Sequence, residues 1–250
     1  MKEVELSTSD GIAVITLNAP ERRNALTVDM AGALTEACAE IDADDTVAVA
    51  VIRGAGKGFC AGAQLQTLSQ AGADPASDEN FRAINAVYQS FYRVGQLAVP
   101  TMAAVHGSAV GAGLNLALAT DLRIVAENAR LFAGFRRLGL HPGGGHFALL
   151  HRAAGREAAA AIGMFAHEID GNAAVRIGLA WEAVSEERVH ERALDTAEGL
   201  AHDPALARRL VQTFRKETGP QAVPWDVAID VERSHQMWSF RRAADRAKPE

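Results

Sequence analysis

The chain has 250 residues, of which 48% are hydrophobic and 22% charged, as in a globular protein with one large domain or one domain and an appendage. Its formal net charge of −6 argues against non-specific nucleic-acid binding, so an anionic ligand would need a local cluster of Arg or Lys. Cys38 and Cys60 suggest neither a disulfide framework nor a metal site, and the N-terminus lacks a signal-peptide pattern. These features predict a cytoplasmic protein.

The N-terminal part predicts a hairpin, a helix and a buried strand. Val4–Thr8 and Ile12–Leu17 flank Asp10-Gly11, a dipeptide that favours a tight turn between two strands. Thr27–Ile41 has helical composition. The continuous apolar run Val47–Ile52 indicates a strand that is covered on both faces.

The rest of the chain alternates strands and helices before it becomes helical. Phe81–Leu97 has the wide apolar face of a helix, whereas Leu122–Ala126 and Arg130–Ala133 have the composition of strands. Ala71–Asp78 predicts a mobile surface loop, and every segment from Ser185 onward has helical composition. The alternation indicates an α/β core followed by a small α-helical appendage.

Pro100–Asp121 is the stretch around which we expect the chain to be organised. It starts with a short buried strand, Met102–Val105, and ends with an apolar helical run, Leu114–Ala119. Three glycines separate the two: Gly107, Gly111 and Gly113. A strand that breaks in glycines and restarts as a helix leaves free backbone N–H groups, which can bind an anion or stabilise an oxyanion.

Two other interpretations of this stretch need no such chemistry. No charged residue occurs in Val94–Thr120, a run long enough to span a bilayer, but Pro100, His106, Asn115 and many small residues make it only weakly apolar. The glycines could also form a packing turn without chemistry, since glycine patterns alone are weak signals. His106 precedes the turn and is interpreted as structural.

Six ordered sequence blocks resemble the enoyl-CoA hydratase/isomerase (crotonase) superfamily. They are residues 20–26, 54–63, 104–113, 121–129, 138–145 and 169–179. The resemblance implies a spiral of ββα units over residues 1–190. It also implies a C-terminal helical region, residues 191–250, that supports trimers often paired into hexamers.

The resemblance also implies a site for an acyl-CoA or enoyl-CoA thioester, with no other cofactor and no metal. The backbone N–H groups of Ala63 and Ala112 would form an oxyanion hole for the thioester oxygen. Coenzyme A would lie near seven residues: Arg22, Arg23, Ala25, Leu26, Ala61, Gln64 and Leu65. The two arginines, with Lys57, could supply the positive charge that the chain lacks overall.

The resemblance fails at the two glutamates that hydratases of this superfamily use on the attacking water. Their positions correspond to Asn115 and Phe135. Asn115 can hydrogen-bond a water molecule but cannot take its proton at neutral pH, and Phe135 can do neither. Gln64 likewise replaces an aspartate that is common in the superfamily.

Nearby groups that could replace the glutamates are His141 and His146, with Arg136 and Arg137 beside them. A loop or subunit-contact role for the histidines remains the alternative. Three functions are therefore open. The chain is either an enzyme with other enolate or oxyanion chemistry, an acyl-CoA binding protein that has lost catalysis, or a hydratase with a rearranged base.

Overall fold

A computed structural model describes residues 2–218 and 224–246. Its strands are β1 Val4–Ser9, β2 Ile12–Leu17, β3 Val49–Gly54, β4 Thr101–Val105, β5 Ser108–Val110, β6 Leu122–Ala126, β7 Arg130–Phe132 and β8 Glu182–Val184. Its α-helices are α1 Val28–Ala43, α2 Leu65–Ala73, α3 Asp78–Gly95, α4 Ala112–Ala119, α5 His146–Ala159, α6 Gly171–Arg176, α7 Val189–Ala201, α8 Pro204–Thr218 and α9 Trp225–Arg246. Short helical segments are η1 Pro20–Arg22, η2 Phe135–Leu138, η3 Ala160–Met164 and η4 Glu186–Arg188.

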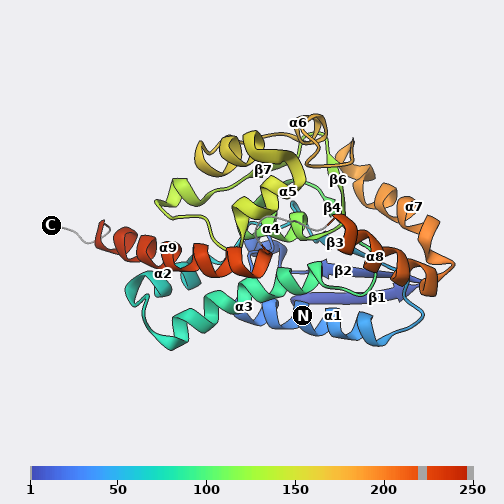
Figure 1. The fold of residues 1–250 in the computed structure, drawn as a ribbon, viewed down its shortest axis with the longest axis horizontal. Helices are drawn as coiled ribbons and strands as arrows, with labels where there is room; N and C mark the ends of the chain where they lie inside the picture. Colours follow the sequence, from blue (N-terminus) through green and yellow to red (C-terminus); the bar gives the residue numbers. More distant parts are fainter. Residues whose placement is uncertain (1, 219–223, 247–250) are drawn as a thin grey trace.

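A six-stranded sheet in the order β1-β2-β3-β4-β6-β8 forms the centre of the fold (Figure 1). β1 and β2 form the expected antiparallel hairpin, in which Asp10 and Gly11 both have positive φ, at 50° and 80°. The remaining neighbours are parallel. β5 and β7 pair separately in a small parallel sheet. The α/β class expected from the sequence is confirmed.

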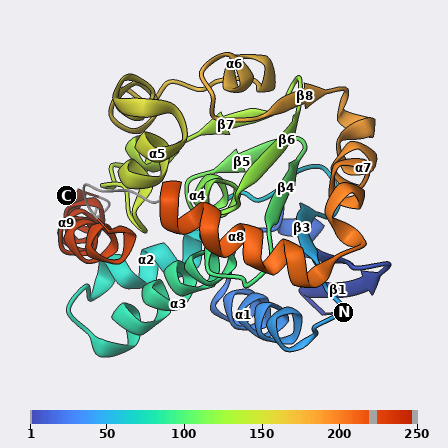
Figure 2. The same cartoon turned by 45° about the vertical axis from the view of Figure 1, so that its right-hand side comes forward.

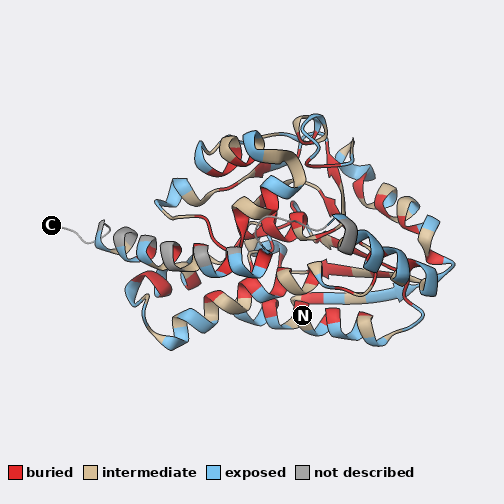
Figure 3. Cartoon of the chain, viewed as in Figure 1, coloured by how far each residue is buried: buried red, intermediate tan, exposed pale blue. Residues whose placement is uncertain are grey.

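Helices cover this sheet and account for its apolar strands. α7 contacts β2, β3, β4 and β6, whereas α1 contacts the hairpin and α3 (Figure 2). Figure 3 shows buried residues along the strands and in α4. The run Val49–Ile52 is almost completely buried, as expected for a strand covered on both faces.

Helix α4 explains the long uncharged stretch of the sequence. All residues from Ala112 to Leu118 are buried, and α4 contacts α3, α5, β4 and β5. It is therefore an apolar helix inside a globular core. Within residues 2–218 and 224–246, no helix is long and apolar enough to cross a membrane.

The loop predicted for Ala71–Asp78 was wrong in its first part. Helix α2 continues to Ala73, and Ala71 is completely buried. A side chain at Gly72 would approach the backbone oxygen of Phe240 to 3.1 Å, because α9 packs closely on α2. The burying partner comes from the far end of the chain, so local composition could not indicate it.

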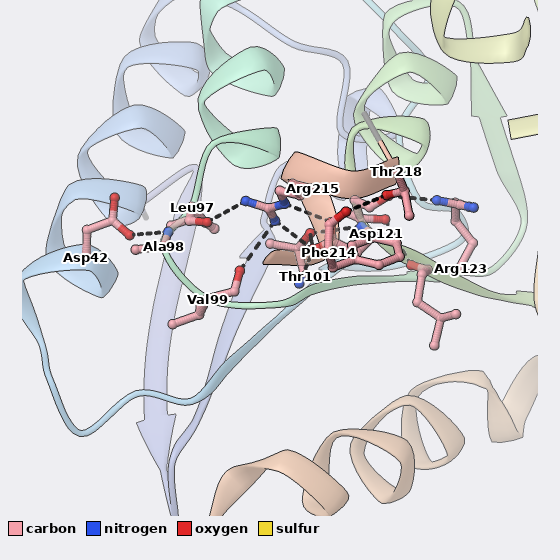
Figure 4. A network of polar contacts seen from close by, with 12 residues as sticks. Asp42, Leu97, Ala98, Val99, Thr101, Asp121, Arg123, Phe214, Arg215 and Thr218 are labelled. Atoms are coloured by element: carbon pink, nitrogen blue, oxygen red, sulfur yellow. Dashed lines mark hydrogen bonds and ion pairs between the residues drawn. The ribbon is translucent and has the colours of Figure 1, made fainter. Parts of the chain in front are cut away.

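Helix α8 is fixed to the core by an ion pair between Arg215 and Asp121 (Figure 4). Arg215 donates from Nε to Oδ1 at 2.9 Å and from Nη2 to Oδ2 at 2.6 Å, and its Nη1 donates to the oxygen of Leu97 at 2.6 Å. Asp121 also accepts from the backbone N–H of Thr101 at 2.8 Å. One carboxylate thus joins helix α8 to the start of β4.

Candidate functional site

Two backbone N–H groups follow glycines in the left-handed region. Gly62 has φ of 96° and precedes Ala63, and Gly111 has φ of 53° and precedes Ala112 at the first turn of α4. Ala112 itself does not have positive φ, so alanine causes no strain there. Among the described residues, neither Ala63 nor Ala112 donates its N–H to another group.

Short backbone pairings hold the Ala63 segment in place. Leu26 donates its N–H to the oxygen of Gly62 at 2.7 Å, and Gln64 donates to the oxygen of Leu26 at 2.9 Å. A side chain at Gly62 would lie 2.7 Å from the oxygen of Val110 and 3.6 Å from the nitrogen of Ala112. The absence of a side chain therefore lets the two donor segments approach each other closely.

A cavity of about 550 Å³ lies beside these donors, and Ala63 and Ala112 both line it. Much of its wall is apolar: Leu65, Leu68, Ile84, Val87, Val110, Phe132, Phe135 and Leu138. Polar side chains also line it: Arg22, Gln64, Gln66, Tyr88, Arg137 and Gln236. Free N–H groups in an apolar cavity are suited to stabilising an oxygen that gains negative charge.

The cavity brings together some of the predicted site residues and not others. The following line it: Arg22, Ala25, Ala61, Ala63, Gln64, Leu65, Ala112 and Phe135. The others do not contribute to its wall: Arg23, Leu26, Asn115, His141 and His146. Leu26 instead supplies the backbone pairing that supports Ala63.

Asn115 and His146 form a buried pair behind the cavity wall, and both side chains are completely buried. Asn115 Oδ1 lies 2.7 Å from His146 Nδ1, and its Nδ2 donates to the oxygen of Gly143 at 3.0 Å. The ring of Phe135 packs edge-on against the ring of His146, with centroids 5.1 Å apart. Burial lowers the pKa of His146 to about 3, so its ring is neutral.

Glu232, on α9, supports the start of α5 and was not predicted from the sequence. Its carboxylate accepts from the N–H groups of Gly145, His146 and Phe147 at 2.9, 3.1 and 3.3 Å. Burial raises the pKa of Glu232 to about 7, although these three donors act in the opposite direction. Glu232 and its backbone donors lie more than 80 positions apart in the sequence. A glutamate within a helical segment does not indicate such a distant contact.

His141 lies in the same loop but has other partners. Its ring Nδ1 is 2.7 Å from the oxygen of Pro142, and the ring packs edge-on against Phe147 with centroids 6.1 Å apart. Gln236, also missed from the sequence, donates from Nε2 to the oxygen of His141 at 3.3 Å. The loop before α5 is therefore held by α9.

The fold and the site define an α/β protein in which Ala63 and Ala112, whose backbone N–H groups have no partner among the described residues, line one largely apolar cavity. The chain belongs to the enoyl-CoA hydratase/isomerase family, whose family model matches residues 7–241. A protein of Mycobacterium tuberculosis named "Probable enoyl-CoA hydratase EchA14" is 44% identical over 86% of this chain and 80% of its own. The 1,2-epoxyphenylacetyl-CoA isomerase of Escherichia coli is 32% identical over 93% and 88%.

Solved structures agree with this assignment. A crystal structure of an enoyl-CoA hydratase from Mycobacterium avium subsp. paratuberculosis matches with a TM-score of 0.83 at 25% identity, over 98% of both chains. Another, from Polaromonas sp. JS666, matches with a TM-score of 0.80 at 28% identity, over 93% of this chain and 89% of that one. The crotonase-like fold expected from the sequence is thereby confirmed.

Proposed function

We propose that the protein binds an acyl-CoA thioester in the 550 Å³ cavity and stabilises its enolate with the N–H groups of Ala63 and Ala112. The observation that carries the proposal is that Ala63 and Ala112 line one largely apolar cavity and that neither donates its backbone N–H to another described group. An enolate oxygen carries the charge that such preorganised donors stabilise most strongly in a dry site. The names of the relatives, an enoyl-CoA hydratase and an epoxyphenylacetyl-CoA isomerase, agree with this substrate class.

The proposed reaction differs from hydration by two glutamates. At the positions that the resemblance implies for them, Asn115 is engaged with His146 and Phe135 presents an apolar ring to the cavity. Neither can activate a water molecule. Decarboxylation, ring chemistry and thioester hydrolysis all use oxyanion stabilisation and do not require two carboxylates.

A second candidate function is acyl-CoA binding without catalysis. It is favoured by the same engagement of Asn115, which is buried behind the wall with both amide ends hydrogen-bonded. In this function the cavity keeps the thioester but has no proton carrier.

Under either function we propose a cytoplasmic protein that assembles as a homotrimer or hexamer through residues 191–250.

The coenzyme A part of the ligand is proposed to lie beside Arg22 and Gln64, which line the cavity together with Ala25, Ala61 and Leu65. Arg22 forms an ion pair with Glu3 at 2.7 Å and with Glu21 at 3.0 Å. A phosphate could exchange with these carboxylates, since phosphate and guanidinium form strong charge-assisted hydrogen bonds.

The test is incubation of the purified protein with a panel of enoyl- and acyl-CoA thioesters in heavy water, followed by mass spectrometry. Deuterium exchange at the α-carbon or loss of carbon dioxide supports the enolate chemistry. Addition of water instead indicates a hydratase with a displaced base. Unchanged thioesters that nevertheless bind tightly favour the binding function, and thioesters that neither bind nor react contradict both proposals.

A further inference from the structure

The hydroxyl group of Tyr88 is buried in the wall of the cavity without a hydrogen-bond partner. Tyr88 lies on α3, lines the cavity and is only 5% exposed. Its Oη makes no hydrogen bond to any other described group. A buried hydroxyl without a partner destabilises the folded state, so native structures seldom keep one without a reason.

The surroundings of this hydroxyl form one polar spot on the cavity wall. A side chain at Gly143 would lie 2.3 Å from Tyr88 Oη and 2.3 Å from both amide atoms of Gln236. Gly143 does not have positive φ, so glycine is needed here for space and not for backbone conformation. The three residues all line the cavity.

The charges around this polar spot favour an uncharged oxygen of the ligand as the acceptor for the Tyr88 hydroxyl. Burial raises the pKa of Tyr88, and the nearby carboxylate of Glu232 acts in the same direction, so the phenol stays protonated and donates. A carboxylate on the ligand would approach Glu232, which has the larger charge effect on this hydroxyl, whereas the opposing cation, Arg233, is paired with Asp230. A keto, ether or hydroxyl oxygen has no such cost.

We infer that Tyr88 donates a hydrogen bond to a neutral oxygen carried by the acyl group in addition to its thioester, so the cavity selects oxygenated acyl groups over plain hydrocarbon chains. This inference rests on the proposed function, in which the cavity holds an acyl-CoA thioester. The apolar residues around the spot, such as Ile84 and Val87, bind hydrocarbon of either kind and cannot discriminate.

The experiment compares two matched series of ligands by calorimetric binding. One series is straight-chain acyl-CoA thioesters of about four to ten carbons, and the other has the same chains with a keto oxygen at one carbon beyond the third. The proteins are the wild type, Tyr88→Phe and Tyr92→Phe. Tyr92, the only other tyrosine, lies one turn further along α3, packs on Trp225 at 4.8 Å and does not line the cavity.

The wild type is expected to bind at least one keto thioester about tenfold more tightly than its hydrocarbon match. Tyr88→Phe is expected to lose this preference and to keep the affinity for hydrocarbon chains, whereas Tyr92→Phe keeps both. Without ligand, Tyr88→Phe should be at least as stable as the wild type, because it removes an unpaired hydroxyl.

Equal affinities for the two series in the wild type, or a preference that survives in Tyr88→Phe, would overturn the inference. Failure of the folded wild type to bind any thioester of either series would overturn the proposed function, and the inference with it. The two failures are therefore distinguishable.

Discussion

Asn115 Oδ1 lies 2.7 Å from His146 Nδ1, and this contact fixes the tautomer of the histidine. Because Asn115 Nδ2 donates to the oxygen of Gly143, its Oδ1 faces His146 as an acceptor, and Nδ1 of the neutral ring carries the proton. Nε2 then holds a lone pair and has no partner among the described residues. The asparagine is thus part of a buried network that orders the loop before α5.

Replacement of Asn115 by Ala should destabilise the fold. The change leaves the oxygen of Gly143 and the N–H of His146 buried and unpaired, at a cost of about 2–4 kcal/mol. Urea unfolding at pH 7 measures the loss. Asn128→Ala is the control, because Asn128 makes an exposed hydrogen bond to Glu186. A loss no larger than that of the control would contradict a stabilising role for the network.

Glu232 should make stability depend on pH in a characteristic direction. Its folded pKa of about 7 lies above the ordinary value of 4.5, so the folded state binds the proton more tightly than the unfolded state. The contribution of this group is therefore greatest below pH 4.5 and is lost as the pH rises towards 7. The loss amounts to about 3 kcal/mol across this window.

Glu232→Gln removes that titration. The free energy of unfolding of the variant, minus that of the wild type, should rise by about 3 kcal/mol between pH 4.5 and 7, since other groups titrate in both proteins. Urea unfolding across the pH range measures the difference, and Glu198→Gln, an exposed position on α7, serves as control. A difference that falls with pH would mean that the three backbone donors outweigh burial.

The sequence predicted the frame of the site better than its interior. The strand Leu122–Ala126 and the hairpin at Asp10 could be predicted from local composition. A strand that is buried in a sheet needs apolar residues, and those residues are visible in the sequence. The resemblance predicted Ala63 and Ala112 as site residues, and both line the cavity. They could be predicted because each follows a glycine with positive φ, and such glycine turns are recognisable as a sequence motif.

The interior depends on contacts between distant segments. Glu232 reaches the N-terminus of α5 from the last helix, and nothing near it in the sequence indicates burial. Tyr88 lies on the apolar face of a predicted helix, where an aromatic residue is indistinguishable from ordinary core. The periodicity of apolar residues identifies the buried face of a helix but does not show which distant segment packs against that face.

Neither predicted histidine is expected to carry a proton for the ligand, because His141 and His146 both lie outside the cavity wall. Replacement of a true general base by Ala lowers turnover by about 100-fold or more, so such a loss in folded His141→Ala or His146→Ala would contradict this expectation. His151→Ala, an exposed position on α5, is the control. Unchanged turnover in both test variants would remove histidine from the mechanism.

Ala112→Pro should remove one of the two proposed oxyanion donors without breaking α4. Proline is tolerated at the first helical position, and the N–H of Ala112 supports no bond to a described group. Exchange at the α-carbon should fall by about 100-fold or more, or thioester affinity should fall if no turnover is found. Ala112→Ser keeps the N–H and should retain most activity. Equal rate and affinity in a folded proline variant would exclude the oxyanion role.

Arg22→Gln should weaken binding of coenzyme A thioesters by about tenfold, since it removes a guanidinium from the cavity rim proposed to hold a phosphate. The same acyl group on N-acetylcysteamine, which has no phosphate, should bind the variant and the wild type equally. Arg82→Gln on α3 is the matched control, because Arg82 is exposed and pairs with Asp78 at 3.7 Å. Equal losses for the two thioesters would mean that Arg22 acts by holding Glu3 and the N-terminal strand, and not by contacting the nucleotide part of the ligand.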